Sequence, residues 1–149
     1  MRIWGRAARA GAPARAAVRT SVRITSQGSP LARLRRAIAT GNPLLVRAAA
    51  AELPHVELED ALAICLVLLD SEPERYEPSA VRWLGRFLLE RRCRSLLDAE
   101  AIAANLAALR HPRSSRLAAL ELGELCREAG LKRAGALLEL RSEQRRPGE

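Results

Sequence analysis

The chain has 149 residues, enough for one domain with a hydrophobic core that needs no disulfide support. Its 28 Ala and 25 Leu outweigh its 14 β-branched residues (Val, Ile and Thr), which argues against a sandwich, a barrel or wholesale disorder. The formal net charge is +8, but residues 1–51 carry ten Arg and no acidic residue, whereas residues 52–149 carry 15 basic and 17 acidic residues.

The first 29 residues are rich in Arg and Ala and contain no acidic residue, and we predict a disordered basic tail for them. We expect six arginines to be able to bind phosphate groups of nucleic acid non-specifically. These candidates are Arg2, Arg6, Arg9, Arg15, Arg19 and Arg23. The same composition is that of an organelle transit peptide, so cleavage of this segment after import is an alternative.

Residues 30–142 have the pattern of a single helical domain, and residues 143–149 form a polar C-terminal tail. The expected helices cover about 30–40, 44–53, 58–71, 79–92, 98–110, 113–129 and 131–142. Short loops make consecutive helices antiparallel. The predicted fold is therefore all-α, a compact bundle or short stack of helix pairs with about seven helices.

Local start and stop signals support these helices. Ser29 and Asn42 are each followed by Pro, the arrangement of an N-cap before the first helical residue. Gly41 and Gly130 are typical of helix ends, and Leu131 is the apolar residue expected to pack back onto the helix before it. The helix over 58–71 is apolar on all sides, so we expect it at the centre of the domain.

The expected fourth helix follows a polar connection, residues 71–78, that contains two prolines. Its apolar stripe of Val81, Leu84 and Leu88 is predicted to face the core. Three of the four aromatic residues, Tyr76, Trp83 and Phe87, also lie here. One interpretation places them in a core otherwise made of Leu and Ala. The other is a recognition surface, because Trp, Tyr and Arg are enriched at binding hot spots. Its candidate partner-binding residues are Tyr76, Arg82, Trp83 and Arg86.

Chemistry-bearing residues are sparse. His55 and His111 lie beside prolines without metal-ligand spacing, and no phosphate-binding glycine loop occurs. The three cysteines, which form no C-x-x-C pair, indicate a reducing compartment, and we expect a cytoplasmic protein. The longest apolar run, 61–69, is too short for a membrane span. We therefore expect no enzymatic activity, no catalytic or metal site and no cofactor.

Two resemblances accompany these patterns. The stretch LELGELCREAGLKRAGALLEL, residues 120–140, resembles one tetratricopeptide helix pair. The matching positions are Leu122, Gly123 and Gly130. Gly135 stands in place of the usual Ala, Glu139 in place of an apolar residue, and the closing Pro is missing. This resemblance implies helix-hairpin geometry but does not imply peptide-binding activity.

The second resemblance covers about residues 31–140. The string ATGNPLLVRAAAAELPHVELEDALAICLVLLDSEPERYEPSAVRWLGRFLLE resembles a group of small uncharacterised all-helical proteins from GC-rich bacteria. The resemblance implies the helical fold and sets residues 1–29 apart as an appendage. It gives no information on activity, cofactors or catalytic residues.

The sequence thus predicts a non-enzymatic protein–protein interaction module with amphipathic helices that can form a groove. The first alternative is a nucleic-acid-associated protein that binds phosphates through its Arg-rich N-terminal segment. The second is an organelle-imported protein whose N-terminal segment is removed. The identity of the partner does not follow from the sequence.

Overall fold

The computed structural model describes residues 28–93 and 95–146. Within these ranges the chain forms seven α-helices and no strand, which confirms the predicted all-α fold. The helices are α1 (Pro30–Thr40), α2 (Pro43–Ala51), α3 (Leu58–Ser71), α4 (Pro73–Glu90), α5 (Leu96–Ala108), α6 (Ser115–Glu128) and α7 (Lys132–Gln144). None of these seven helices is long and apolar enough to cross a bilayer.

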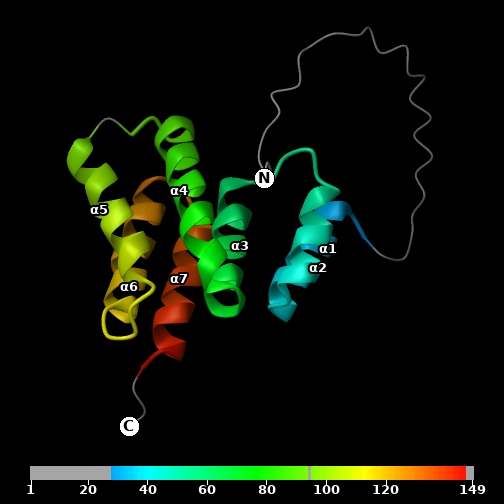
Figure 1. The fold of residues 1–149 in the computed structure, drawn as a ribbon. Helices are drawn as coiled ribbons and strands as arrows, with labels where there is room; N and C mark the ends of the chain where they lie inside the picture. The colour runs from blue at the N-terminus through cyan, green and yellow to red at the C-terminus, as the bar shows by residue number, and fades with distance from the viewer. Residues whose placement is uncertain (1–27, 94, 147–149) are drawn as a thin grey trace, which may run out of the picture.

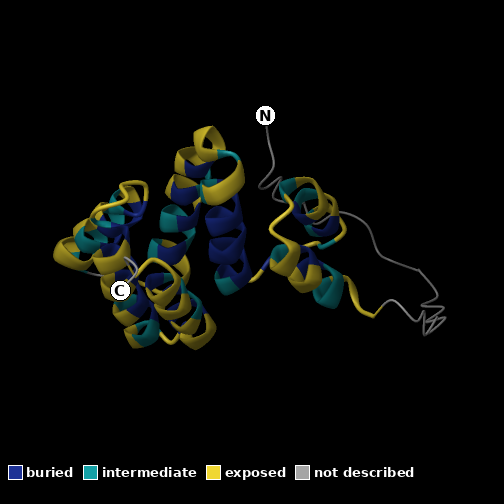
Figure 2. Ribbon diagram, turned by 90° about the horizontal axis from the view of Figure 1, so that it is seen from below, coloured by how far each residue is buried: buried dark blue, intermediate teal, exposed yellow. Residues whose placement is uncertain are grey.

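Helix α3 lies at the centre of the fold, as its all-round apolar surface predicts. It contacts α1, α2, α4 and α7. The α1–α2 hairpin packs on one side of α3, and the remaining helices lie on the other side (Figure 1). Coloured by burial, α3 is the most deeply buried of the seven described helices (Figure 2). The helices packed around α3 therefore determine which parts of its surface remain accessible.

The predicted caps are present. The Ser29 hydroxyl accepts a hydrogen bond from the Ala32 N–H at 3.2 Å, and the Asn42 side chain accepts one from the Leu44 N–H at 3.0 Å. Gly41 and Gly130 end their helices with φ of 70° and 82°, the left-handed conformation that glycine adopts without strain. These local signals are correct because each depends on only a few neighbouring residues.

The start of α4 differs from the prediction. The helix begins at Pro73 rather than near residue 79, so most of the expected 71–78 connection is helical. Pro73 occupies the first turn, where its missing N–H costs nothing. Pro78 lies inside the helix on its exposed side, where water can solvate the carbonyl that its missing N–H leaves without a bond. Two prolines therefore do not exclude a helix here.

Candidate functional site

The aromatic residues of α4 lie in the core. The side chains of Tyr76 and Trp83 are 1% and 2% exposed. The Tyr76 hydroxyl donates to the Leu106 carbonyl at 2.7 Å, and the Trp83 indole N–H donates to the Leu58 carbonyl at 2.8 Å. Both polar groups are thus satisfied inside the protein. The core interpretation is confirmed, and the expectation of an exposed aromatic recognition surface is wrong for Tyr76 and Trp83.

The same burial corrects the predicted orientation of α4. The buried residues of this helix are Tyr76, Ala80, Trp83 and Phe87. The predicted stripe is less buried: Leu84 and Leu88 are half-buried, and Val81 is exposed. The large aromatic rings bury more apolar area than the aliphatic side chains, and they determine which face turns inward.

A second stripe of α4 consists of the residues that directly precede the four buried residues in the sequence. Its members are Arg75, Ser79, Arg82 and Arg86. Because consecutive helical residues are about 100° apart, this stripe lies beside the buried one. Arg82 and Arg86, from the predicted partner-binding set, therefore stay at the surface while Tyr76 and Trp83 do not.

The stripe borders a groove of about 1040 Å³ between α2, the following connection, α3 and α4. The groove floor is apolar and consists of Val46, Ala61, Ile64, Cys65, Leu68 and Trp83. All of these side chains are less than 10% exposed, so the floor is recessed between the walls. This arrangement has the character of a binding cleft, with apolar lining at its base and polar groups at its edge.

Small side chains on α2 leave the groove open. Ala50 and Ala51 line its α2 wall. Helices α2 and α4 both pack on α3 but do not contact each other in the described part of the chain. Sequence reasoning missed this site, although the run Ala48–Ala51 was a signal: a helix wall of alanines cannot fill the space beside it.

Ion pairs mark one end of the groove. Glu72, between α3 and α4, accepts a hydrogen bond from Arg47 of the α2 wall at 2.7 Å. It also pairs with Arg75 of the α4 wall at 3.2 Å. One carboxylate therefore faces arginines from both walls and joins the walls at this end.

Arg86 lies at the other end and is also engaged. Its guanidinium donates to the Val56 carbonyl at 2.9 Å and pairs with Glu90 at 2.8 Å. The Nε2 atom of His55 lies 3.5 Å from the same guanidinium. Arg82 lies between the two ends on the rim; it is exposed and forms no ion pair with any described residue.

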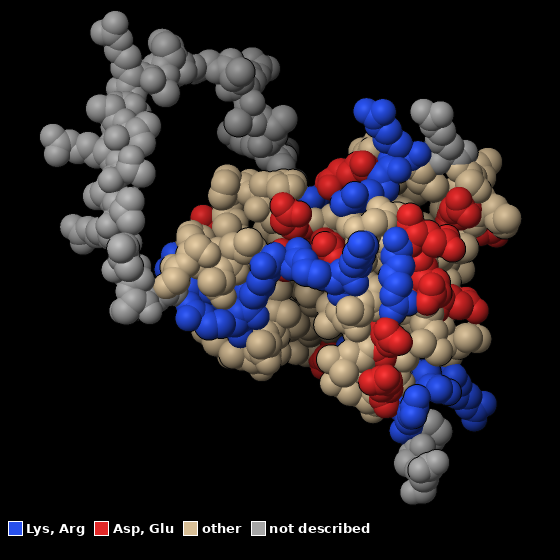
Figure 3. Space-filling model, turned by 180° about the vertical axis from the view of Figure 1, so that it is seen from behind, with Lys and Arg blue, Asp and Glu red and all other residues tan. Residues whose placement is uncertain are grey.

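Many other arginines are close to carboxylates. Seen from behind, basic side chains form a band from the α1–α2 end towards the middle of the molecule, with acidic side chains beside it (Figure 3). Arg133, for example, pairs with Glu59 and Asp60 at 3.4 and 3.3 Å. Such pairs neutralise much of the positive charge on the helical domain.

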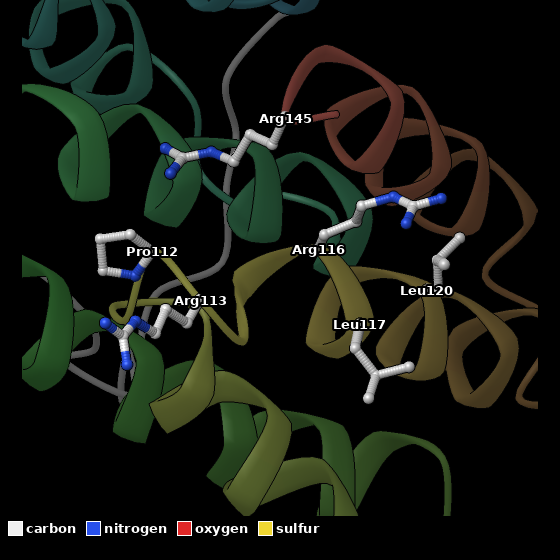
Figure 4. Close-up of a pocket in the computed structure, with 6 residues that line it drawn as sticks. All are labelled: Pro112, Arg113, Arg116, Leu117, Leu120 and Arg145. Carbon is white, nitrogen blue, oxygen red and sulfur yellow. The ribbon is translucent and has the colours of Figure 1, made fainter. Parts of the chain in front are cut away.

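A second, shallower depression of about 440 Å³ lies at the amino end of α6. Its lining residues are Pro112, Arg113, Arg116, Leu117, Leu120 and Arg145. The guanidinium groups of Arg113 and Arg116 point away from each other (Figure 4). Arg145 is paired with Asp70 at 3.1 Å. The three arginines therefore do not converge on a common anion.

The cysteines and histidines do not form a reactive centre in the described part of the chain. Burial raises the pKa of the Cys65 and Cys126 thiols to about 12 each, so both remain protonated at neutral pH. Cys93 is half-buried, and its Sγ donates to the Ser95 carbonyl at 3.4 Å. Among residues 28–93 and 95–146, no three His, Cys, Asp or Glu side chains are placed to hold a metal ion.

The predicted phosphate-binding arginines lie outside the described residues. They are Arg2, Arg6, Arg9, Arg15, Arg19 and Arg23. Phosphate binding by this segment, and its removal after import, stay predictions.

Comparison of the chain with models of known families, with curated proteins and with solved structures found no match.

Proposed function

We propose that this protein is a helical protein–protein interaction module that binds an amphipathic helix of a partner protein in the groove between α2, α3 and α4. The single observation that carries the proposal is this open groove with an apolar floor. Recognition of an amphipathic helix by an apolar groove is a recurring mode of peptide binding. The binding free energy would come mainly from removing apolar surface from water.

The spacing of the floor residues supports a helical ligand. On α3, Ala61, Ile64, Cys65 and Leu68 occupy positions i, i+3, i+4 and i+7, which lie along one face of the helix. An amphipathic partner helix presents apolar residues at the same i, i+3, i+4 and i+7 spacing. Its anchors can therefore meet successive turns of the floor when it lies along α3.

A designed amphipathic peptide with uncharged glutamines beside its apolar stripe tests the proposal without any contribution from charge. We expect titration of the ¹⁵N-labelled full chain to shift the amide signals of Ala50, Ala61 and Ser79, which line the groove. Signals of α6 and α7, which do not line the groove, should not change.

Two variants of α2 form a matched pair for this experiment. Both Ala48 and Ala51 are exposed, but only Ala51 lines the groove. Ala51→Trp should block the groove and abolish binding, whereas Ala48→Trp should bind like the unaltered chain. Equal loss in both variants, or no binding to the unaltered chain, would reject the proposed function.

The charge distribution of the sequence favours a second candidate function, non-specific nucleic-acid binding through the Arg-rich N-terminal segment. Deletion of residues 1–27 removes the six candidate arginines and keeps Ser29, which caps α1. This deletion should abolish binding to DNA, and binding by the full chain should fall steeply with added salt. Affinity that survives the deletion would exclude this function for the segment.

A further inference from the structure

We infer that the helix bound in the groove is acidic along the side that faces α4, with a carboxylate opposite Arg82. This inference rests on the proposed function and adds the chemistry of the partner. It follows from the charges on the groove rim and from their spacing along α4.

The charged rim is predominantly basic. The charged residues that line the groove are Arg47, Glu74, Arg75, Arg82 and Arg86. Glu72 and Glu90, just outside the lining, pair with three of the arginines. One positive charge remains in excess after these carboxylates are counted. It is best assigned to Arg82, because this exposed guanidinium forms no ion pair with another described residue.

A carboxylate is the group that Arg82 would bind best. The planar guanidinium matches a carboxylate in a two-bond geometry. A partner helix in the groove would displace water from the Arg82 side chain. A cationic residue opposite Arg82 would then be repelled in a partly desolvated site, and a neutral residue would leave the charge unpaired.

The charge of the rim argues against the N-terminal segment of the same chain as the occupant. Residues 1–27 carry six arginines and no acidic residue. Placed in the groove, this segment would bring like charge towards Arg82 and its neighbours. An acidic helix from another protein has the complementary charge.

The spacing of the rim arginines indicates where further acidic residues would lie. Arg75, Arg82 and Arg86 are separated by seven and four residues on α4. Two helices side by side have the same rise of about 1.5 Å per residue. Carboxylates spaced by seven and four residues on the partner would therefore lie next to the three arginines. The carboxylate opposite Arg82 would not compete with Glu72 or Glu90, because these two residues pair with the other arginines.

The test uses three peptides with one apolar stripe and with Glu, Gln or Lys at the positions facing α4. We expect the full chain to bind the Glu peptide at least about threefold more tightly than the Gln peptide, and the Lys peptide most weakly. Added salt should reduce this preference. Arg82→Glu should reverse the order, whereas Arg116→Glu on α6, with the same change of charge outside the groove, should preserve it.

The outcomes separate the two proposals. Equal affinity for all three peptides, or an order that Arg82→Glu does not alter, overturns the acidic partner and leaves the helix-binding groove in place. Failure of every peptide to bind overturns the proposed function as well. If dodecanoate binds more tightly than the peptides and displaces them, the groove belongs to a fatty acid and the inference is overturned. If the groove signals shift with the concentration of the protein alone, the groove binds a second copy of the chain, which also overturns the inference.

Discussion

Arg35 of α1 donates two hydrogen bonds to the carboxylate of Asp60 on α3, from Nε and Nη2, each at 3.2 Å. Asp60 is only 4% exposed, and it also accepts a hydrogen bond from Arg133 of α7 at 3.3 Å. One buried carboxylate thus joins the α1–α2 hairpin, the central helix and the C-terminal helix. Because the hairpin forms one wall of the groove, this contact also helps to set the groove width.

The Asp60 contacts predict non-additive effects on stability. Arg35→Ala or Arg133→Ala alone leaves Asp60 with one cationic partner, and we expect each to cost about 1 kcal/mol. The double variant leaves a buried carboxylate without a cation and should cost about 3–5 kcal/mol. Urea denaturation of the four proteins measures the coupling. If the effect of the double variant on the free energy of unfolding equals the sum of the two single effects within about 0.5 kcal/mol, the two arginines do not act together on Asp60 and the prediction is wrong.

Trp83, which forms part of the groove floor, is also predicted to be a major contributor to the stability of the fold. Trp83→Ala should lower the free energy of unfolding by about 3–5 kcal/mol, because it removes a large buried ring and the hydrogen bond to Leu58. Val81→Ala, on the exposed side of the same helix, should change it by less than about 0.5 kcal/mol. Chemical denaturation compares the two. A small effect of Trp83→Ala would contradict its place in the core.

Two glycines in helices should respond to alanine in opposite ways. A Cβ at Gly85 meets no atom within 4 Å, so Gly85→Ala should stabilise α4 by about 0.5–1 kcal/mol. At Gly135 a Cβ would lie 2.6 Å from Arg127 Cγ and 3.0 Å from the Gly123 carbonyl oxygen. Gly135→Ala should therefore destabilise the α6–α7 contact by about 1–3 kcal/mol. Thermal unfolding of both variants should give shifts of opposite sign.

Stability at acid pH should depend on Asp70. Hydrogen bonds from Arg141 at 2.8 and 2.6 Å, aided by Arg145, lower the pKa of this half-exposed carboxyl. Its ionised form therefore stabilises the fold above the unfolded-state pKa of about 3.9, and the contribution is lost as pH falls through the lower folded-state pKa. Asp70→Asn should cost up to about 1 kcal/mol at pH 7, since solvent screens the pair. Urea denaturation should show this difference shrinking as the pH falls below the unfolded-state pKa of about 3.9. A difference that persists at lower pH would refute the linkage.

Local signals predicted where many helices begin and end. The caps at Ser29 and Asn42 and the glycine at residue 130 each act within a few residues of the chain. The apolar sequence of α3 likewise predicted its central position, because no face of this helix can remain in water. These features could be predicted because the caps depend only on neighbouring residues, and the burial of α3 depends only on its apolar composition.

The orientation of α4 could not be predicted in the same way. Its aliphatic and aromatic stripes both have helical spacing, and both are candidates for the core. The inward face depends on contacts with distant residues, such as the Leu58 and Leu106 carbonyls that accept hydrogen bonds from Trp83 and Tyr76. The orientation of α4 also places Arg82 on the groove rim, so the candidate site could not be predicted before this orientation was known.

The all-helical architecture of the described residues, the caps of the first helices and the concentration of arginines before the first acidic residue, Glu52, all follow from the amino-acid sequence. Which side chains contact each other depends on how the helices pack. Helix α7, for instance, has no cap from its own N-cap residue; the Glu59 carboxylate of α3 accepts its Ala134 N–H at 2.8 Å. The groove has the same origin: residues far apart in the chain line it, and its shape depends on how three helices pack.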